Sequence, residues 1–117
     1  MPLVTVYTSA LLPAEETSQA LLRKLSSAVV EILGKPERYV MTSLVPRSQM
    51  MFAGTFAPAC LVDVQSIGAL AGDRPKQLTE AACRFVQEEL GVPKDRIFVV
   101  FTDVPARLWG FDGSTLG

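Results

Sequence analysis

Histidine is absent from this chain of 117 residues, and cysteine occurs only twice. Since the imidazole is the usual acid or base near neutral pH, the groups left for such chemistry are two thiols and the α-amino group, which titrates at about 8. Cys60 and Cys83 stand apart, in apolar surroundings, without the spacing of a zinc or redox motif. The sequence therefore predicts two buried thiols of a reducing compartment, no disulfide framework, no metal site and no cofactor.

Long apolar runs and blocks of one charge are also missing. No stretch approaches the roughly 18 residues of a membrane span, although 49% of the residues are hydrophobic and the mean hydropathy is +0.29. The 11 basic and 12 acidic residues are scattered, which argues against nucleic acid and membranes as partners. The first residues do not resemble a signal peptide, so we expect a cytoplasmic location. The surplus apolar surface predicts a soluble homo-oligomer.

What the chain does contain is a weak internal repeat. Leu3–Val6 returns as Leu61–Val64, and Leu33–Pro36 returns as Leu90–Pro93, at offsets of 58 and 57 residues. Each half reads as strand, helix, Leu-Gly-x-Pro and strand, and the shared order favours a structural duplication. The length suits one core, so residues 1–117 are expected to form a single domain.

Both predicted helices are amphipathic and carry start and stop signals. Pro13, Glu15 and Glu16 suit the beginning of the first helix, and Asp73 is placed to cap the second. Gly34 and Gly91 are expected to end the helices in the left-handed conformation. The side chains expected to face the core are Leu21, Leu25, Ala28, Val29 and Ile32 in the first helix, and Leu78, Ala82, Phe85, Val86 and Leu90 in the second.

The predicted strands are apolar on both faces. Ile97–Phe101 has no polar alternation, and Tyr39–Val45 has little. Helical connections imply parallel pairing within each β-α-β unit. The sequence therefore predicts an α+β fold of two layers, with a four-stranded mixed sheet and two helices on one face. Another copy of the same sheet is expected to cover the bare face.

Three features could carry chemistry at one end of such a sheet. If the initiator methionine is removed, Pro2 begins the chain with a free secondary amine. Lys35 follows a glycine at a helix end, and Ser66-Ile67-Gly68 follows a strand, where a ligand can approach backbone amides. Each also has an ordinary interpretation, since many chains begin Met-Pro, a helix C-terminus favours lysine, and Ser-Ile-Gly often forms a simple turn.

A family resemblance joins these features. It runs in order through the whole chain, in Met1-Pro2, Ile32–Pro36, Met50–Thr55, Ser66–Gly68 and Asp95–Phe98. On these motifs the sequence resembles the family of macrophage migration inhibitory factor and D-dopachrome tautomerase. The resemblance implies a homotrimer whose sheets form a central barrel with the helices outside. It also implies an active site between subunits that catalyses keto–enol tautomerisation of 2-oxo acids, such as phenylpyruvate, or of dopachrome-like compounds.

The resemblance assigns roles to particular residues. Pro2 is the implied general base, and lowering its pKa from about 8 to about 6 costs roughly 2.7 kcal/mol. Burial and the positive charge of Lys35 act in that direction. Lys35 and the Ile67 amide are implied to bind the substrate, with Phe98 and Val100 supplied by a neighbouring subunit. The remaining implied lining residues are Leu3, Phe111 and Trp109.

The chain also departs from the family pattern. Phe98, Val100 and Gln65 stand where the animal cytokines usually have tyrosine, asparagine and histidine, so the pocket mouth is expected to be more apolar. The cytokine's CxxC is absent, and its pseudo-receptor motif fails at Leu12 and Arg47. Two alternatives to an active tautomerase follow. One is a signalling protein, secreted without a signal peptide, that binds a cell-surface receptor, and the other is a trimer with a vestigial pocket.

Overall fold

A computed structural model describes residues 1–11 and 14–117 of the chain. The expectations for Leu12 and Pro13 therefore concern positions outside the described residues. The elements follow the predicted order of two β-α-β units with a short hairpin at the end: β1 (Pro2–Thr8), α1 (Glu15–Leu33), β2 (Met41–Val45), β3 (Cys60–Ser66), α2 (Arg74–Leu90), β4 (Ile97–Asp103), β5 (Gly110–Phe111) and β6 (Ser114–Thr115).

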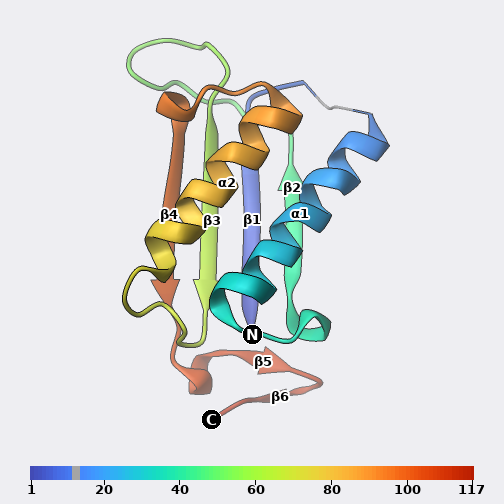
Figure 1. Cartoon of the computed structure of the whole chain (residues 1–117), viewed down its shortest axis with the longest axis vertical. Coiled ribbons are helices and arrows are strands. Elements are labelled where there is room, and N and C mark those ends of the chain that lie inside the picture. Colours follow the sequence, from blue (N-terminus) through green and yellow to red (C-terminus); the bar gives the residue numbers. More distant parts are fainter. Residues whose placement is uncertain (12–13) are drawn as a thin grey trace.

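The main sheet has four strands in the order β2-β1-β3-β4. Each β-α-β unit pairs its strands in parallel, and the two units meet through the antiparallel pair of β1 and β3. Both helices lie against the same face of the sheet (Figure 1). The predicted two-layer fold, its mixed sheet and its parallel units are confirmed.

The two halves of the structure repeat each other closely. β1 and β3 both have seven residues with the same alternation of buried and half-buried side chains. Because they run antiparallel, Pro2 at the start of β1 faces Ser66 at the end of β3, and Thr8 faces Cys60. Gly34 and Gly91 end the two helices at the same left-handed φ of 69°. The repeat seen in the sequence is therefore also present in the C-terminal caps of the helices.

The core lies between the helices and the sheet. Most predicted core positions are confirmed, but Ile32, Phe85 and Leu90 are only partly buried and pack at its border. The correction has a simple cause at Phe85, whose ring lies at the helix flank, 4.9 Å from the Arg84 guanidinium. The buried helix side chains are Leu21, Leu25, Ala28, Val29 and Leu33 in α1, and Leu78, Ala81, Ala82, Cys83 and Val86 in α2.

Both cysteines are buried and unpaired, as the sequence predicted. Burial raises the pKa of the Cys60 thiol to about 12, with a smaller contribution from Cys83. Burial also raises the pKa of Cys83, although the positive charge of Lys94 opposes the shift. A high thiol pKa leaves little of the reactive thiolate at neutral pH, so these thiols serve the core.

The face of the sheet that the helices leave uncovered carries exposed apolar side chains. Met41, Phe98 and Val100 expose 64%, 60% and 49% of their surfaces. Ile97 on the same strand as Phe98 is buried on the helix side, which shows that β4 has an apolar side chain on either face. Within residues 1–11 and 14–117, no helix is both long and apolar enough to cross a membrane.

The Arg96 side chain holds the long connection between β2 and β3 in place through hydrogen bonds. Its guanidinium donates to the carbonyls of Phe52, Ala57 and Pro58 at 3.2, 2.9 and 2.8 Å. It also lies 5.2 Å from the centre of the Phe52 ring, and that ring packs edge-on against Phe98 at 4.8 Å between centroids. One side chain therefore fixes both the loop and an aromatic contact of β4.

Replacing Arg96 by methionine is expected to lower the free energy of unfolding by about 2–3 kcal/mol, because hydrogen bonds to charged groups contribute about 1.5–3 kcal/mol. Urea denaturation followed by circular dichroism measures the change. The matched control is Arg107→Met at an exposed arginine, where surface substitutions usually stay within about 0.5 kcal/mol. Equal effects of the two substitutions would show that the loop does not depend on Arg96.

Candidate functional site

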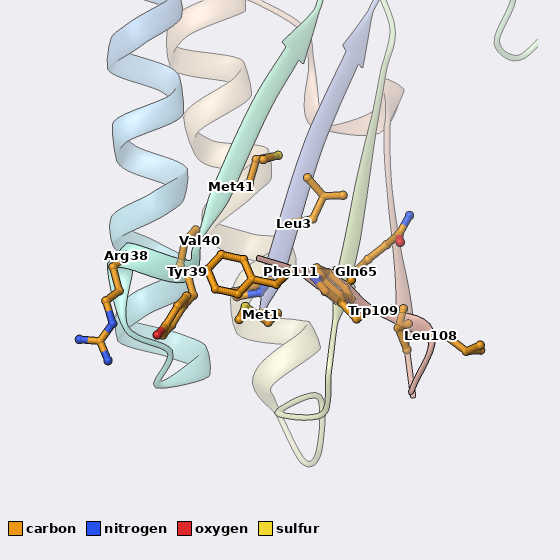
Figure 2. A pocket seen from close by; sticks show the side chains of 13 residues that line it. Met1, Leu3, Arg38, Tyr39, Val40, Met41, Gln65, Leu108, Trp109 and Phe111 are labelled. Atoms are coloured by element: carbon orange, nitrogen blue, oxygen red, sulfur yellow. The ribbon is translucent and has the colours of Figure 1, made fainter. Parts of the chain in front are cut away.

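A cavity of about 430 Å³ lies at the end of the sheet where β1 begins. The starts of β1 and β2 and the C-terminal segment enclose it (Figure 2). Its wall is mostly apolar and aromatic, and consists of Met1, Pro2, Leu3, Arg38, Tyr39, Val40, Met41, Gln65, Val104, Leu108, Trp109, Gly110 and Phe111. Pockets of this size and character commonly hold small molecules.

Four predicted site residues line this cavity together: Pro2, Leu3, Trp109 and Phe111. Sequence reasoning missed Tyr39, whose ring meets Phe111 edge-on at 5.5 Å and 88°. Tyr39 stands three residues after Pro36 of the Gly-Lys-Pro stop signal and ends a 3-10 turn (Glu37–Tyr39). This closeness to the motif was the signal in the sequence that could have indicated Tyr39.

Arg38 is the other cavity residue that sequence reasoning missed. Its guanidinium lies 4.8 Å from the centre of the Tyr39 ring. In Figure 2 the Arg38 side chain stands at the edge of the pocket and points away from Phe111. Among the described lining residues, it is the one with a charged side chain. The cavity wall is therefore apolar with a positive rim.

Lys35 and Ile67 lie beside Met1, although neither is part of the cavity wall. The Lys35 ammonium donates to the Ile67 carbonyl at 3.1 Å. The Ile67 N–H donates in turn to the Met1 carbonyl at 3.4 Å. The structure thus brings the predicted lysine, the predicted amide and the first residue of the chain together.

The loop that carries Ile67 is tied to the end of β4. The Gly68 N–H donates to the Asp103 carboxylate at 2.9 Å, and the Val104 N–H donates to the Ser66 carbonyl at the same distance. Gly68 has a φ of 68°, which a glycine adopts without strain. Asp103 was not predicted, since only the folded sheet places it beside this loop.

The surroundings of the N-terminus disfavour a positive charge. Burial, and secondarily the charge of Lys35, lower the pKa of the Met1 amine below its ordinary value of 8.0. Pro2, one residue further along, is less than 2% exposed. The Met1 amine therefore meets both influences that favour its neutral form.

Neither Phe98 nor Val100 is part of the cavity wall within one chain. Phe98 pairs with Leu61, which pairs with Tyr7, so Phe98 stands five positions along the sheet from Pro2. At about 3.3 Å per residue this separation is roughly 17 Å. A role for Phe98 in the site thus requires that it come from a second chain, as the sequence prediction has it for both Phe98 and Val100.

Comparisons with known proteins agree on one family. A family model described as macrophage migration inhibitory factor (MIF) matches residues 1–117. The macrophage migration inhibitory factor homolog of Brugia malayi is 33% identical over 117 residues, covering all of both chains. The macrophage migration inhibitory factor of Rattus norvegicus is 29% identical over 115 residues, covering 98% of each chain.

Solved structures give the same result. The macrophage migration inhibitory factor homologue from Prochlorococcus marinus superposes with a TM-score of 0.91 at 49% sequence identity, over 98% of this chain and 99% of the other. Leishmania major MIF2 superposes with a TM-score of 0.90 at 30% identity, over 98% and 97% of the two chains. The likeness therefore extends over the full length of the fold.

Proposed function

The chain belongs to the macrophage migration inhibitory factor family, and from this premise we propose that it is a tautomerase of 2-oxo acids with Pro2 as its general base. The substrates proposed are of the phenylpyruvate or dopachrome type, and no metal or organic cofactor takes part. The carrying observation is that burial and Lys35 lower the pKa of the Met1 amine, one residue before Pro2, at the edge of an apolar cavity.

The proposed base arises when Met1 is removed. The Pro2 nitrogen then changes from an amide, which has no basic lone pair, to a secondary amine. Pro2 is almost completely buried, and Lys35 lies beside the same end of the chain. A neutral amine in this position can accept a proton from carbon, which an ammonium cannot.

The proposed reaction moves one proton. The Pro2 nitrogen takes it from the carbon next to the substrate carbonyl, the electron pair forms the enolate, and a proton is returned to the oxygen to give the enol. Lys35 and the Ile67 amide hold the substrate carboxylate. Loss of Met1 frees the Ile67 N–H, which donates to the Met1 carbonyl in the intact chain. The apolar walls exclude water, which strengthens these contacts.

A homotrimer completes this proposal. The uncovered sheet face carries exposed Met41, Phe98 and Val100, an apolar surface of the kind that interfaces bury. Since neither Phe98 nor Val100 lines the cavity of its own chain, we propose that they join the cavity of a neighbouring subunit. Phenylalanine and valine there would give the substrate apolar contacts.

Turnover and its pH dependence test the proposal. We expect the purified protein, shown by intact mass to begin at Pro2, to interconvert keto and enol phenylpyruvate. The neutral amine is the active form, and we expect the same surroundings that lower the pKa of the Met1 amine to lower that of the Pro2 amine. The value of kcat/KM should therefore rise with pH through a pKa below about 8 and then level off. A protein that begins at Pro2 and shows no turnover at any pH from 5 to 9 would refute the tautomerase assignment.

A cytokine-like binding role is the second candidate, because the relatives are named as migration inhibitory factors. In this proposal the protein leaves its cytoplasmic location without a signal peptide and binds a cell-surface receptor. A cell response that persists in Pro2→Gly would favour this role, whereas a response lost together with turnover would tie it to the tautomerase chemistry.

A further inference from the structure

Ser66 carries a buried hydroxyl without a hydrogen-bond partner. Its side chain is 0% exposed, and its Oγ contacts no donor or acceptor among the described residues. A buried hydroxyl in this condition is destabilising and needs an explanation. Ser66 faces Pro2 across the antiparallel pair of β1 and β3, so the hydroxyl stands at the end of the sheet that holds the proposed base.

The other end of the duplicated sheet shows what this hydroxyl can do. Thr8 occupies the equivalent position there, as the last residue of β1 opposite the first residue of β3. Its Oγ1 donates to the Ala59 carbonyl at 3.0 Å, and the Ser9 N–H donates to the same carbonyl at 3.2 Å. A hydroxyl and the next backbone amide thus converge on the carbonyl that precedes the opposite strand.

The end of the sheet with Pro2 has the equivalent carbonyl, amide and hydroxyl groups, but the hydrogen bond from the hydroxyl is not formed there. The Met1 carbonyl precedes β1 as the Ala59 carbonyl precedes β3, and the Ile67 N–H donates to it at 3.4 Å. Ser66 and Ile67 follow each other as Thr8 and Ser9 do. Removal of Met1 takes this carbonyl away and leaves the Ile67 N–H without its acceptor, beside a Ser66 hydroxyl that has no partner.

We infer that Ser66 Oγ and the Ile67 N–H form a two-donor site for one carboxylate oxygen of the substrate, in the place that the Met1 carbonyl vacates. This inference rests on the proposed function and adds Ser66 to its binding residues. The charge at this place favours an anion, since Lys35 donates to the Ile67 carbonyl at 3.1 Å and its field reaches the N-terminal amine. Two donors beside a cation bind a carboxylate strongly.

The position of the site also suits the chemistry. In a 2-oxo acid the carbon that loses its proton is two bonds away from the carboxylate carbon. A carboxylate held where the Met1 carbonyl was lies next to the Pro2 nitrogen, since that carbonyl is bonded to the same nitrogen in the intact chain. Ser66 is therefore a binding contact that holds the carboxylate end of the substrate beside the base.

The test compares Ser66→Ala with Thr8→Ala, which deletes the equivalent hydroxyl at the other end of the sheet. All proteins begin at Pro2. The readouts are kcat and KM for phenylpyruvate, and the affinity for cinnamate, an unreactive carboxylate, from quenching of Trp109, the single tryptophan and a cavity residue. We expect Ser66→Ala to raise KM and the cinnamate Kd about tenfold with little change in kcat, the effect of one good hydrogen bond.

The two other variants separate binding from structure. Thr8→Ala should leave KM and the cinnamate Kd unchanged and lower only the unfolding midpoint. Ser66→Thr restores a hydroxyl that the fold already accommodates at position 8, so the cinnamate Kd should return to within about threefold of the original protein. Such a rescue cannot come from a general loss of packing.

Several outcomes overturn the inference. It is wrong if Ser66→Ala leaves the cinnamate Kd unchanged, if Thr8→Ala weakens binding equally, or if the original protein does not bind cinnamate. Absence of phenylpyruvate turnover in a protein that binds cinnamate would refute the proposed tautomerase, and the Kd series would still decide the role of Ser66.

Discussion

Insertion of one alanine between Met1 and Pro2 is expected to lower kcat/KM for phenylpyruvate by about 10²- to 10⁴-fold, the usual contribution of a general base. Removal of the methionine then exposes an alanine, and the proline nitrogen remains an amide without basicity. The inserted residue also supplies a carbonyl where that of Met1 lies now, within reach of the Ile67 N–H. The single insertion thus removes the proposed base and occupies the proposed binding position of the substrate carboxylate. None of the side chains that line the cavity is substituted.

The measurement is steady-state kinetics on proteins whose first residue is confirmed by intact mass. Pro2→Gly serves as the companion variant, since it keeps a free amine but loses the ring and its burial. We expect its activity to fall as well, and to stay above that of the insertion variant. Activity of the insertion variant within threefold of the original protein would show that the N-terminal nitrogen is not the base.

Val100→Asp is expected to abolish assembly at micromolar concentration and, with it, turnover. Val100 is 49% exposed on the uncovered face of β4, next to Asp63 in the neighbouring strand. A second carboxylate here would be buried beside Asp63 in the proposed trimer, and bringing a charge into an interface next to a like charge costs several kcal/mol in each subunit. Analytical ultracentrifugation should then give the mass of one chain, 12.7 kDa, in place of three times that mass.

The control places the same charge on the opposite face of the molecule. Gln77 is exposed in the first turn of α2, so Gln77→Asp changes the net charge equally and leaves the sheet face untouched. It should keep the assembly and the activity. A trimer that survives Val100→Asp would show that this face of β4 is not the interface.

Much of the fold could be predicted from the sequence because its signals are local. The repeat of Leu-Gly-x-Pro marks where both helices end, and Gly34 and Gly91 take the left-handed conformation that such a signal predicts. Helical connections fix the parallel pairing within each unit. The partial exposure of Phe85 was not predictable, since it depends on where Arg84 and Lys24 lie around the ring in the folded helices.

The site was less predictable, because much of it depends on pairing across the sheet. Pro2 was recognisable from its chemistry, and Trp109 and Phe111 from the family resemblance. Tyr39 and Arg38 enter the cavity only because the turn after α1 folds toward the C-terminal segment. The place of Ser66 opposite Pro2 comes from strand register, which no pattern within either strand specifies.

The two ends of the duplicated sheet serve different purposes: the end with Thr8 serves stability, and the end with Pro2 serves the proposed function. At the end with Thr8, the equivalent residues have partners or are buried. The Thr8 hydroxyl is hydrogen-bonded and Cys60 is buried. Val92, which corresponds to Lys35 in the repeat, is also fully buried. At the end with Pro2, a hydroxyl lacks a partner and a cation stands beside a buried amine. Functional sites commonly break such local rules at a cost in stability. Substitutions that stabilise this fold should therefore be sought at the first end, where the trade-off between stability and activity does not apply.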